Sequence, residues 1–236
     1  MKSFYCFVLL ALLMVNSAFA DEAAIRAEMA KKFPYSKIIS VSKTSYLGLY
    51  EVAFDDHLVY TDDKMTYIFS GNILDMHTLR NLTEDREQQL YAIKFDSLPL
   101  DLAIKNVKGN GKRRMAVFTD PNCSYCKRLE KAIVNLTNAT VYIFVYPILP
   151  GSDEKAKAIW CAPDRLQAWE DHMLKGMEPK MEKTCDTAAL TKISKQAKTL
   201  GINLTPTLVF EDGMIKPGTL TLELLEERLA ESSGKN

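Results

Sequence analysis

Two cysteines separated by two residues stand at the junction between a stretch with strand character and a stretch with helix character. Residues 114–119 form a short, largely apolar run, and the Asp120-Pro121 pair that follows ends regular structure. After Cys123-Ser124-Tyr125-Cys126, apolar side chains recur at spacings of three and four, while charged side chains fill the opposite face. That periodicity is typical of an amphipathic helix. The sequence therefore predicts a strand, a turn and a helix whose first turn carries both sulfur atoms.

The two cysteines are expected to differ in their chemistry. Cys123 would lie at the helix start, where unpaired backbone N–H groups and the positive end of the helix dipole favour an anion. Thiols at such positions commonly have pKa values of about 3.5–7.5, against about 8.5 for a free thiol. Cys126 falls on the apolar face and is expected to be buried and harder to ionise. An exposed Cys123 that attacks a substrate disulfide, with a sheltered Cys126 that resolves the mixed disulfide, suits reversible thiol–disulfide exchange.

Two other interpretations of the motif stay open. A zinc site would need further ligands, but Cys161 and Cys185 are far apart in the sequence, and His57, His77 and His172 show no ligand spacing. A purely structural disulfide within the motif is the second alternative, although a bridge that closes so small a loop stabilises little. We favour a redox-active pair, and we expect no metal and no cofactor.

The first twenty residues have the pattern of a secretory signal peptide. Lys2 provides a minimal positive start, residues 4–15 are apolar but too short to anchor in a bilayer, and Ala18-Phe19-Ala20 matches the small-x-small cleavage pattern. We therefore expect export and removal of residues 1–20, which would leave 216 of the 236 residues. That length suffices for two small domains or one large one. No later stretch is typical of a membrane-spanning helix, so we expect a soluble mature protein.

The net charge and the cysteine count indicate which partners and which disulfides to expect. Loss of Lys2 would leave a formal charge near −1, and nothing in that balance indicates a nucleic-acid or membrane partner. Cys6 would leave with the signal, and four cysteines in an oxidising compartment indicate two pairs. We expect Cys123 to pair with Cys126 and Cys161 with Cys185. Two free buried thiols at the latter positions are the alternative.

The N-terminal part of the mature chain is expected to be a small α+β module. A helical pattern covers residues 23–33, and short β-rich runs divided by polar turns cover residues 37–76, which predicts about five antiparallel strands. Its core would be thin for so few residues, which suggests that one face is buried against a partner. A polar helix follows, as expected for a connector between domains. We assign the module to residues 21–78 and a linker helix to residues 79–95.

The remaining residues, 96–236, are expected to form an α/β domain. Residues 101–107 are predicted to be a short helix, and the continuous apolar run 140–146 suits a central strand covered on both faces. Residues 186–200 form a clean amphipathic pattern. Residues 207–215 are predicted to form a hairpin with an Asp-Gly turn, before a closing helix.

This order of elements resembles the thioredoxin fold with a helical insertion. In that fold a cis-proline loop faces the Cys-x-x-Cys motif, and Leu204-Thr205-Pro206-Thr207 stands at the matching place before the hairpin. The resemblance therefore implies a cis bond before Pro206. It also implies that Thr205 and Pro206 bind an extended substrate strand beside the sulfur atoms.

The whole mature chain resembles the DsbC/DsbG family of periplasmic disulfide isomerases, and the DsbC branch more closely. The likeness rests on the Val-Phe-Thr-Asp-Pro lead-in, Cys123-Ser124-Tyr125-Cys126, Ala158-Ile159-Trp160-Cys161, Cys185, and the Thr205-Pro206 loop. It implies a V-shaped homodimer joined through the small, cystatin-like N-terminal modules, with an uncharged cleft for misfolded, disulfide-containing exported proteins. It also implies that a membrane-bound, DsbD-like reductase keeps Cys123 and Cys126 reduced.

Two departures from the related patterns affect the chemistry. Ser124 stands where these enzymes often have glycine or proline, and the residues between the cysteines tune the redox potential. Val117 replaces the buried carboxylate that thioredoxin carries before its first cysteine, so proton transfer to Cys126 needs another group or water, with Asp120 as one candidate. There are two alternatives to an isomerase and reductase. One is a net disulfide oxidase, and the other is a chaperone-like binding module whose disulfides are structural.

Overall fold

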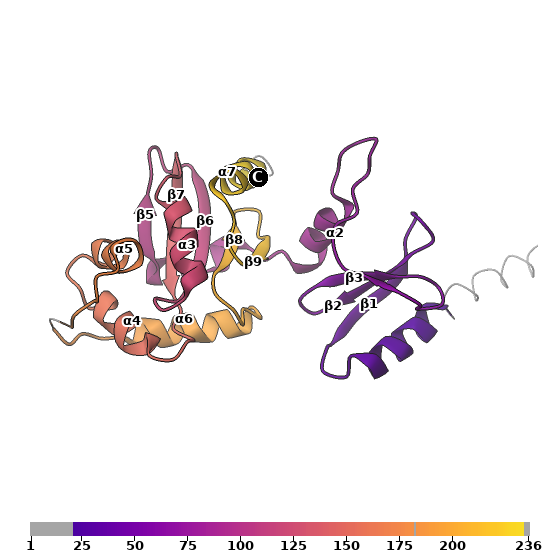
Figure 1. Cartoon of the computed structure of the whole chain (residues 1–236), viewed down its shortest axis with the longest axis horizontal. Helices are drawn as coiled ribbons and strands as arrows, with labels where there is room; N and C mark the ends of the chain where they lie inside the picture. Colours follow the sequence, from indigo (N-terminus) through magenta and orange to yellow (C-terminus); the bar gives the residue numbers. More distant parts are fainter. Residues whose placement is uncertain (1–20, 182, 234–236) are drawn as a thin grey trace, which may run out of the picture. The chain divides into compact units, whose positions relative to one another are not determined.

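A computed structural model describes residues 21–181 and 183–233, which divide into two compact units with the boundary between Tyr91 and Ala92 (Figure 1). The expected signal peptide, including Cys6, lies outside the described residues. No helix within residues 21–181 and 183–233 combines the length and the apolar character needed to cross a membrane.

The first unit is a helix followed by an antiparallel sheet. Residues 21–32 are helical. Four strands pair in sequential order: β1 (Ile38–Lys43), β2 (Tyr50–Phe54), β3 (Leu58–Thr61) and β4 (Ile68–Phe69). Ile25 and Met29 of the helix pack with side chains of the first three strands to form the core. The fifth strand is absent from residues 21–91, where Leu74 makes only an isolated bridge to Asn81.

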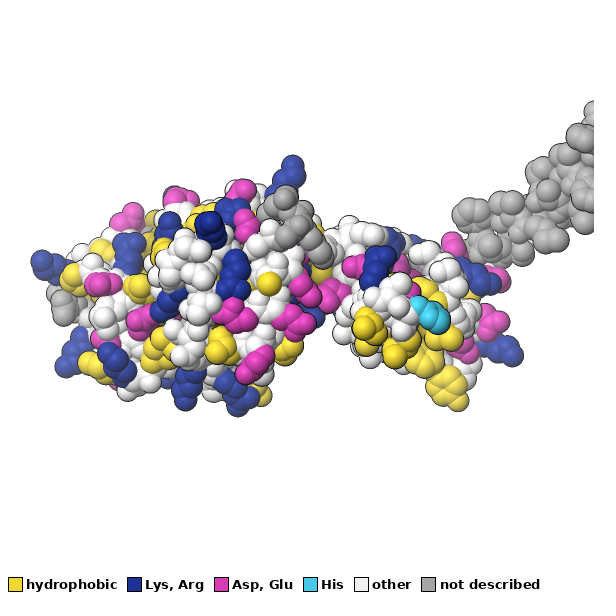
Figure 2. Space-filling view, turned by 90° about the horizontal axis from the view of Figure 1, so that it is seen from above, with side chains coloured by type: hydrophobic (Ala, Val, Ile, Leu, Met, Phe, Trp, Pro, Cys, Tyr) yellow, Lys and Arg dark blue, Asp and Glu magenta, His cyan; other side chains and the backbone are white. Residues whose placement is uncertain are grey.

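The surface of the first unit carries an apolar face. Figure 2 shows hydrophobic side chains gathered on one part of this unit. We define the β4 face by its exposed large side chains: Tyr67, Ile68, Phe69, Leu74, Met76 and Leu79. Strand β4 is at the edge of the sheet and has only two residues, both with exposed side chains. Exposed apolar side chains beside an unpaired strand edge are typical of an interaction surface.

The helix expected over residues 79–95 spans Leu82–Tyr91 (α2) and groups with the first unit. Three of its side chains contact the sheet. The Thr83 hydroxyl lies 2.9 Å from that of Tyr60, the Arg86 guanidinium binds the Glu51 carboxylate at 2.8 Å, and the Tyr91 hydroxyl donates to the Phe54 carbonyl oxygen at 2.7 Å. These polar contacts explain why α2 packs against the sheet although its sequence lacks an apolar face.

The second unit contains a mixed five-stranded sheet in the order β5-β7-β6-β8-β9. The strands are β5 (Ile104–Val107), β6 (Arg113–Thr119), β7 (Ala139–Val145), β8 (Thr207–Phe210) and β9 (Ile215–Pro217). The helices are α3 (Ser124–Ile133), α4 (Ser152–Trp160), α5 (Arg165–Lys175), α6 (Ala188–Thr199) and α7 (Leu222–Ser233). Only β6 and β7 run parallel, and they occupy neighbouring places inside the sheet. Helix α3 packs with α5 and α7, while α6 packs against β7.

The prediction of a helix over residues 101–107 is wrong. A single 3-10 turn covers Leu100–Leu102, and Ile104–Val107 is strand β5, which pairs antiparallel with β7 at the edge of the sheet. Along β5 the side chains alternate between buried and exposed. This period of two is the pattern of a strand with one face covered, and it is too short to outweigh a helical interpretation in the sequence alone.

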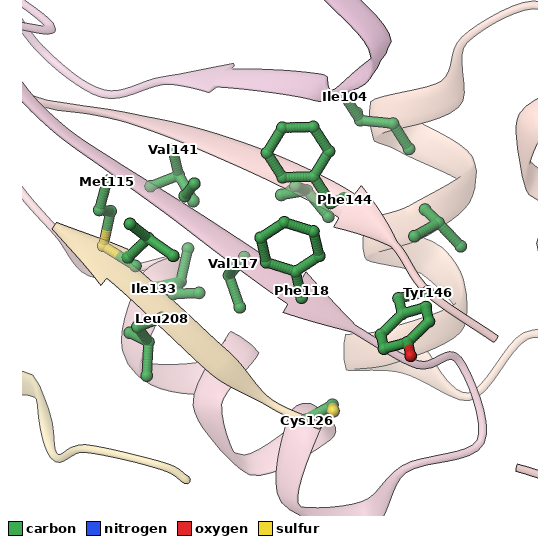
Figure 3. Packing of buried hydrophobic residues seen from close by; sticks show 14 of the residues in the cluster. Ile104, Met115, Val117, Phe118, Cys126, Ile133, Val141, Phe144, Tyr146 and Leu208 are labelled. Atoms are coloured by element: carbon green, nitrogen blue, oxygen red, sulfur yellow. The ribbon is translucent and has the colours of Figure 1, made fainter. Parts of the chain in front are cut away.

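The core of the second unit surrounds the two central strands (Figure 3). The run 140–146 was expected to be a doubly covered strand, and most of β7 is fully buried. Phe118 of β6 and Phe144 of β7 stack with their ring centroids 4.8 Å apart. Cys126, Leu129 and Ile133 are the buried apolar positions of α3 in this cluster. The core therefore fixes the position of the Cys-x-x-Cys helix relative to the end of β6.

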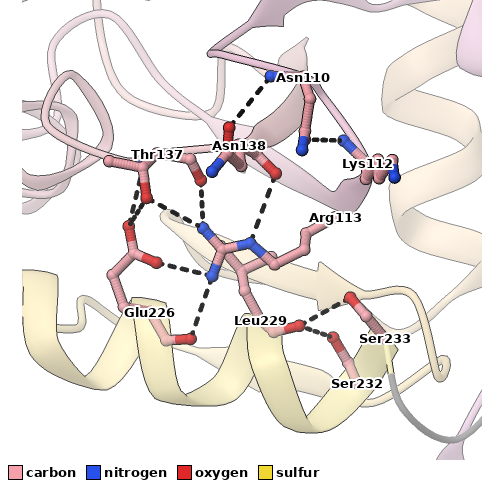
Figure 4. A network of polar contacts seen from close by, with 9 residues as sticks. All are labelled: Asn110, Lys112, Arg113, Thr137, Asn138, Glu226, Leu229, Ser232 and Ser233. Atoms are coloured by element: carbon pink, nitrogen blue, oxygen red, sulfur yellow. Dashed lines mark hydrogen bonds and ion pairs between the residues drawn. The ribbon is translucent and has the colours of Figure 1, made fainter.

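The start of β6 is held by a polar network around Arg113 (Figure 4). Its guanidinium forms an ion pair with the Glu226 carboxylate at 2.6 Å and donates to the Thr137 carbonyl oxygen. The Thr137 backbone N–H donates to the same carboxylate at 2.9 Å. These contacts join β6, the segment before β7 and helix α7, at the opposite end of β6 from the cysteines.

Candidate active site

Cys123 occupies the N-cap position of α3. Its sulfur accepts a hydrogen bond from the backbone N–H of Cys126 at 3.2 Å, as a capping side chain does. The same sulfur donates its S–H to the carbonyl oxygen of Thr205 at 3.3 Å. The peptide bond between Thr205 and Pro206 is cis, as the resemblance implied. The structure therefore brings together the motif and the proline loop, which are about eighty residues apart in the chain.

Cys126 is buried, as predicted. Burial raises the pKa of its thiol to about 12, and the hydrogen bond with Cys123 acts in the same direction. Thiolates, and not thiols, are the nucleophiles in disulfide exchange. Of the two sulfur atoms, that of Cys123 is therefore the better candidate for the first attack.

The expected exposure of Cys123 is wrong for this conformation, because only 5 % of the residue is exposed. The contact with the Thr205 carbonyl oxygen covers the sulfur. Four exposed apolar side chains lie in the motif itself or in the segments that adjoin it: Tyr125, Ile148, Leu149 and Leu204. A substrate strand that replaces the contact with the proline loop would uncover the sulfur and meet an apolar surface.

Asp120 anchors the turn between β6 and α3. One carboxylate oxygen accepts from the Asn122 N–H at 2.7 Å and the Ser152 hydroxyl at 2.6 Å. The other accepts from the backbone N–H groups of Ile148 and Leu149 at 2.7 and 2.9 Å. A fully buried carboxylate that accepts four hydrogen bonds is typical of an ionised anchor. These contacts do not favour Asp120 as the proton relay to Cys126.

Sequence reasoning missed Glu130, a buried carboxyl on α3. One oxygen accepts from the indole N–H of Trp169 at 3.0 Å, and the other has no hydrogen-bond partner among the described residues. Burial raises the pKa of Glu130 to about 7, although the Trp169 bond opposes that rise. The only local signal was a charged residue at the edge of the apolar face of α3.

Substitution of Glu130 by glutamine is expected to stabilise the second unit at high pH only. An acid whose folded pKa of about 7 exceeds the unfolded value of about 4.3 favours folding below pH 4.3, and this contribution is lost as the pH rises through 7. As the pH rises from 5 to 8, the free energy of unfolding of the variant should therefore increase by about 2–3 kcal/mol relative to that of wild type. Urea unfolding followed by tryptophan fluorescence measures it, since Trp160 and Trp169 both belong to the second unit.

Glu154→Gln on the exposed side of α4 is the matched control for the loss of a carboxylate at the surface. A Glu130→Gln difference that stays constant from pH 5 to pH 8 would contradict the assigned ionisation of Glu130.

Cys161 and Cys185 form a disulfide with an S–S distance of 2.01 Å, the pairing predicted from the cysteine count. The bond links the end of α4 to the segment before α6. Beside it the indole N–H of Trp160 donates to the carbonyl oxygen of Asp186 at 3.2 Å. Cys123 and Cys126, which the cysteine count also predicted to be paired, are both free thiols in this structure. Within residues 21–181 and 183–233, no three His, Cys, Asp or Glu side chains are grouped as metal ligands.

Comparison with known proteins gives matches for both units. Residues 16–84 match the family described as the disulfide bond isomerase protein N-terminal domain. Residues 100–232 match the thioredoxin-like domain family. The two matches fall on either side of the boundary between the compact units.

Individual relatives cover most of the chain. A probable thiol:disulfide interchange protein DsbC from Bordetella parapertussis is 41% identical over 207 residues, which cover 87% of this chain and 73% of the relative. The thiol:disulfide interchange protein DsbC of Escherichia coli is 27% identical over 241 residues, 97% of this chain and 98% of that protein. A crystal structure of a disulfide interchange protein from Neisseria gonorrhoeae superimposes with a TM-score of 0.55 at 42% identity, over 58% of this chain and 99% of that one.

Proposed function

Because this chain belongs to the DsbC family of thiol:disulfide interchange proteins, we propose that it isomerises and reduces disulfides in misfolded exported proteins, with Cys123 as nucleophile and Cys126 as resolving thiol. The observation that carries the assignment of roles is the contrast between the two sulfur atoms. The Cys123 sulfur caps α3 and contacts the proline loop, whereas burial holds Cys126 as a thiol.

The exchange proceeds in two steps whose atoms and electrons balance. The Cys123 thiolate attacks one sulfur of a substrate disulfide, the S–S bond breaks, and the other substrate sulfur leaves as a thiolate that takes up a proton. The mixed disulfide is then attacked in one of two ways. A second substrate thiolate releases Cys123 and leaves a rearranged disulfide, or Cys126 loses its proton and attacks, which reduces the substrate and oxidises the pair.

Thr205 and Pro206 are proposed to bind the substrate backbone. The carbonyl oxygen of Thr205 already accepts a hydrogen bond from the Cys123 sulfur, so it lies where a bound strand would meet the reacting atom. Strand addition through main-chain hydrogen bonds requires no particular side chains on the partner. This suits substrates that share a wrong disulfide but no sequence.

The β4 face is proposed to bind a second copy of this chain, so that two active sites serve one homodimer. Ile68 and Phe69 of the short edge strand β4 have exposed side chains, and further exposed apolar side chains follow within residues 74–79. Edge-to-edge pairing of two β4 strands would satisfy backbone groups that are otherwise left to water. We place the protein in the periplasm, where a membrane-bound, DsbD-like thiol reductase would return Cys123 and Cys126 to the reduced form.

The redox state of the cysteine pair in the native compartment tests the isomerase assignment. Acid quenching of cells followed by thiol trapping is expected to label two cysteines per chain, because an isomerase must begin each cycle with a free thiolate. The Cys161–Cys185 disulfide is the internal control and should label only after reduction and unfolding. A pair that is fully oxidised at steady state would instead support a net oxidase, or a chaperone-like binding module with structural disulfides.

A further inference from the structure

His172 is a buried histidine of α5 whose two ring nitrogens both face backbone carbonyl oxygens. Nε2 lies 2.9 Å from the carbonyl oxygen of Pro121, two residues before Cys123. Nδ1 lies 3.0 Å from the carbonyl oxygen of Met177, just beyond the end of α5. The side chain therefore links the turn in front of the nucleophile to the C-terminal end of α5.

These two contacts make different demands on the neutral and the doubly protonated ring. A carbonyl oxygen only accepts hydrogen bonds, and a neutral imidazole has one N–H group and one bare nitrogen. In the neutral form the nitrogen without a hydrogen would therefore face a carbonyl oxygen, and the lone pairs of these two atoms would repel each other. Only the imidazolium donates from both nitrogens, and a buried polar group left without its hydrogen bond destabilises the fold.

The surroundings of His172 also favour a cation. The residue lies in the last turn of α5, where the negative end of the helix dipole stabilises positive charge. Glu178 follows the helix and adds a carboxyl on this side of the unit, and the pKa of that carboxyl is lowered mainly by its hydrogen bond with Lys155. Neither observation depends on the hydrogen bonds of the ring itself.

Asp120 supplies the complementary charge on the other side of the same peptide group. The peptide between Pro121 and Asn122 presents its carbonyl oxygen to His172 and its N–H to the Asp120 carboxylate, at 2.9 and 2.7 Å. A cationic donor at one end of a peptide dipole and an anionic acceptor at the other polarise it and strengthen both hydrogen bonds. The peptide that leads into Cys123 is thereby held from both sides.

We propose that His172 is a positioning residue of the exchange reaction: as an imidazolium it tethers the Pro121–Asn122 peptide and adds positive charge near Cys123, which favours the thiolate. The tether fixes the N-terminal turn of α3, whose backbone N–H at Cys126 donates to the Cys123 sulfur. Positive charge near a cysteine stabilises the thiolate over the thiol. Loss of the imidazolium would therefore leave a folded protein that attacks disulfides more slowly at low pH.

The other charged groups around His172 come from each element packed with α5. Lys127 of α3 and Lys155 of α4 both lower the pKa of Glu178, and they add positive charge on this side of the unit. Asp171 and Lys175 of α5 form an ion pair with each other at 2.6 Å. Further along the helices, Glu130 of α3, Glu170 of α5 and Lys108 after β5 form a separate group whose charges act on Glu130.

Imidazole NMR of the reduced wild-type protein tests the protonation state without any substitution. At neutral pH the two-bond nitrogen–proton spectrum of His172 should show two protonated nitrogens, with slowly exchanging N–H protons. The signals of the exposed His57 and His77 serve as references. A His172 ring that is neutral at pH 7 would overturn the proposal.

The pH profile of Cys123 alkylation tests the effect on the nucleophile. In a Cys126→Ser background, which leaves one free thiol, iodoacetamide reacts with Cys123 in proportion to the thiolate fraction. His172→Gln should slow alkylation at pH 6 by about three- to tenfold. This slowing corresponds to a pKa shift of about 0.5–1 unit, which is smaller than the 1–3 units that a charge in direct contact produces. At high pH its rate should return to that of the parent, and the matched control His57→Gln should follow the parent throughout.

A folded His172→Gln variant with an unshifted profile would refute the effect on Cys123. If the variant does not fold, the NMR measurement on the wild-type protein still decides whether the imidazolium exists. The inference rests on the proposed role of Cys123 as the reactive thiol. Alkylation and NMR do not depend on isomerase activity, so failure of this inference can be told apart from failure of the proposed function.

Discussion

Replacement of Cys123 by serine is expected to abolish disulfide exchange, with a loss on the order of 10³-fold or more in insulin reduction. The serine hydroxyl does not ionise near neutral pH. The remaining free thiol is that of Cys126, which is only 1 % exposed, and burial raises its pKa to about 12. A protein disulfide can therefore neither reach Cys126 nor find it as a thiolate.

The matched variant is Cys126→Ser, which keeps the attacking sulfur and removes the resolving one. It should accumulate mixed disulfides with substrate proteins, visible as reductant-sensitive bands at higher mass on a non-reducing gel. Appreciable insulin turnover by Cys123→Ser, or mixed disulfides trapped on Cys126 in that variant, would show that the roles of the two cysteines are assigned in the wrong order.

Removal of the N-terminal unit is expected to separate reduction from isomerisation. The cut belongs between Tyr91 and Ala92, because the backbone N–H of Ile93 donates to the carbonyl oxygen of Gly213 inside the second unit. Residues 92–236 keep their own core and both cysteines, so they should form a soluble monomer that still reduces insulin. The same monomer should rearrange scrambled ribonuclease poorly.

The reason is the effective concentration of thiolate around a bound substrate. Rearrangement requires that a misfolded chain stays bound while wrong bonds are attacked and right ones form. Two active sites joined in one dimer can present thiolate at an effective concentration of about millimolar for a short linkage. A monomer loses that advantage while its single-site chemistry is intact.

Point substitutions in the β4 face provide the control for deletion. Ile68→Lys with Phe69→Lys adds charge to two exposed side chains of the edge strand, and should dissociate the dimer without removal of a unit. Light scattering gives the mass, and the insulin and ribonuclease assays are run side by side. A truncated protein that stays dimeric, or a monomer with full isomerase activity, would contradict the proposed role of the first unit.

The sequence by itself determined the features that depend on local pattern. The spacing of apolar residues predicted α3 and placed Cys126 inside the core, and the continuous apolar run predicted the buried strand β7. The even number of cysteines predicted the Cys161–Cys185 disulfide. These succeed because helix periodicity, strand burial and cysteine pairing are recorded in neighbouring residues or in composition.

The tertiary structure alone decided how the nucleophile is surrounded. Residues 104–107 form a strand because β7 pairs with them, and Cys123 is covered because Thr205 lies against it from 82 positions away in the chain. His172, considered only as a metal ligand in the sequence, contacts the carbonyl oxygen of Pro121 across 51 positions. Both acceptors are backbone oxygens, which every residue carries and no sequence pattern marks. Contacts of this kind arise only when the core has set the distances between elements, so the folded chain, and not any local motif, determines the environment of the reacting sulfur.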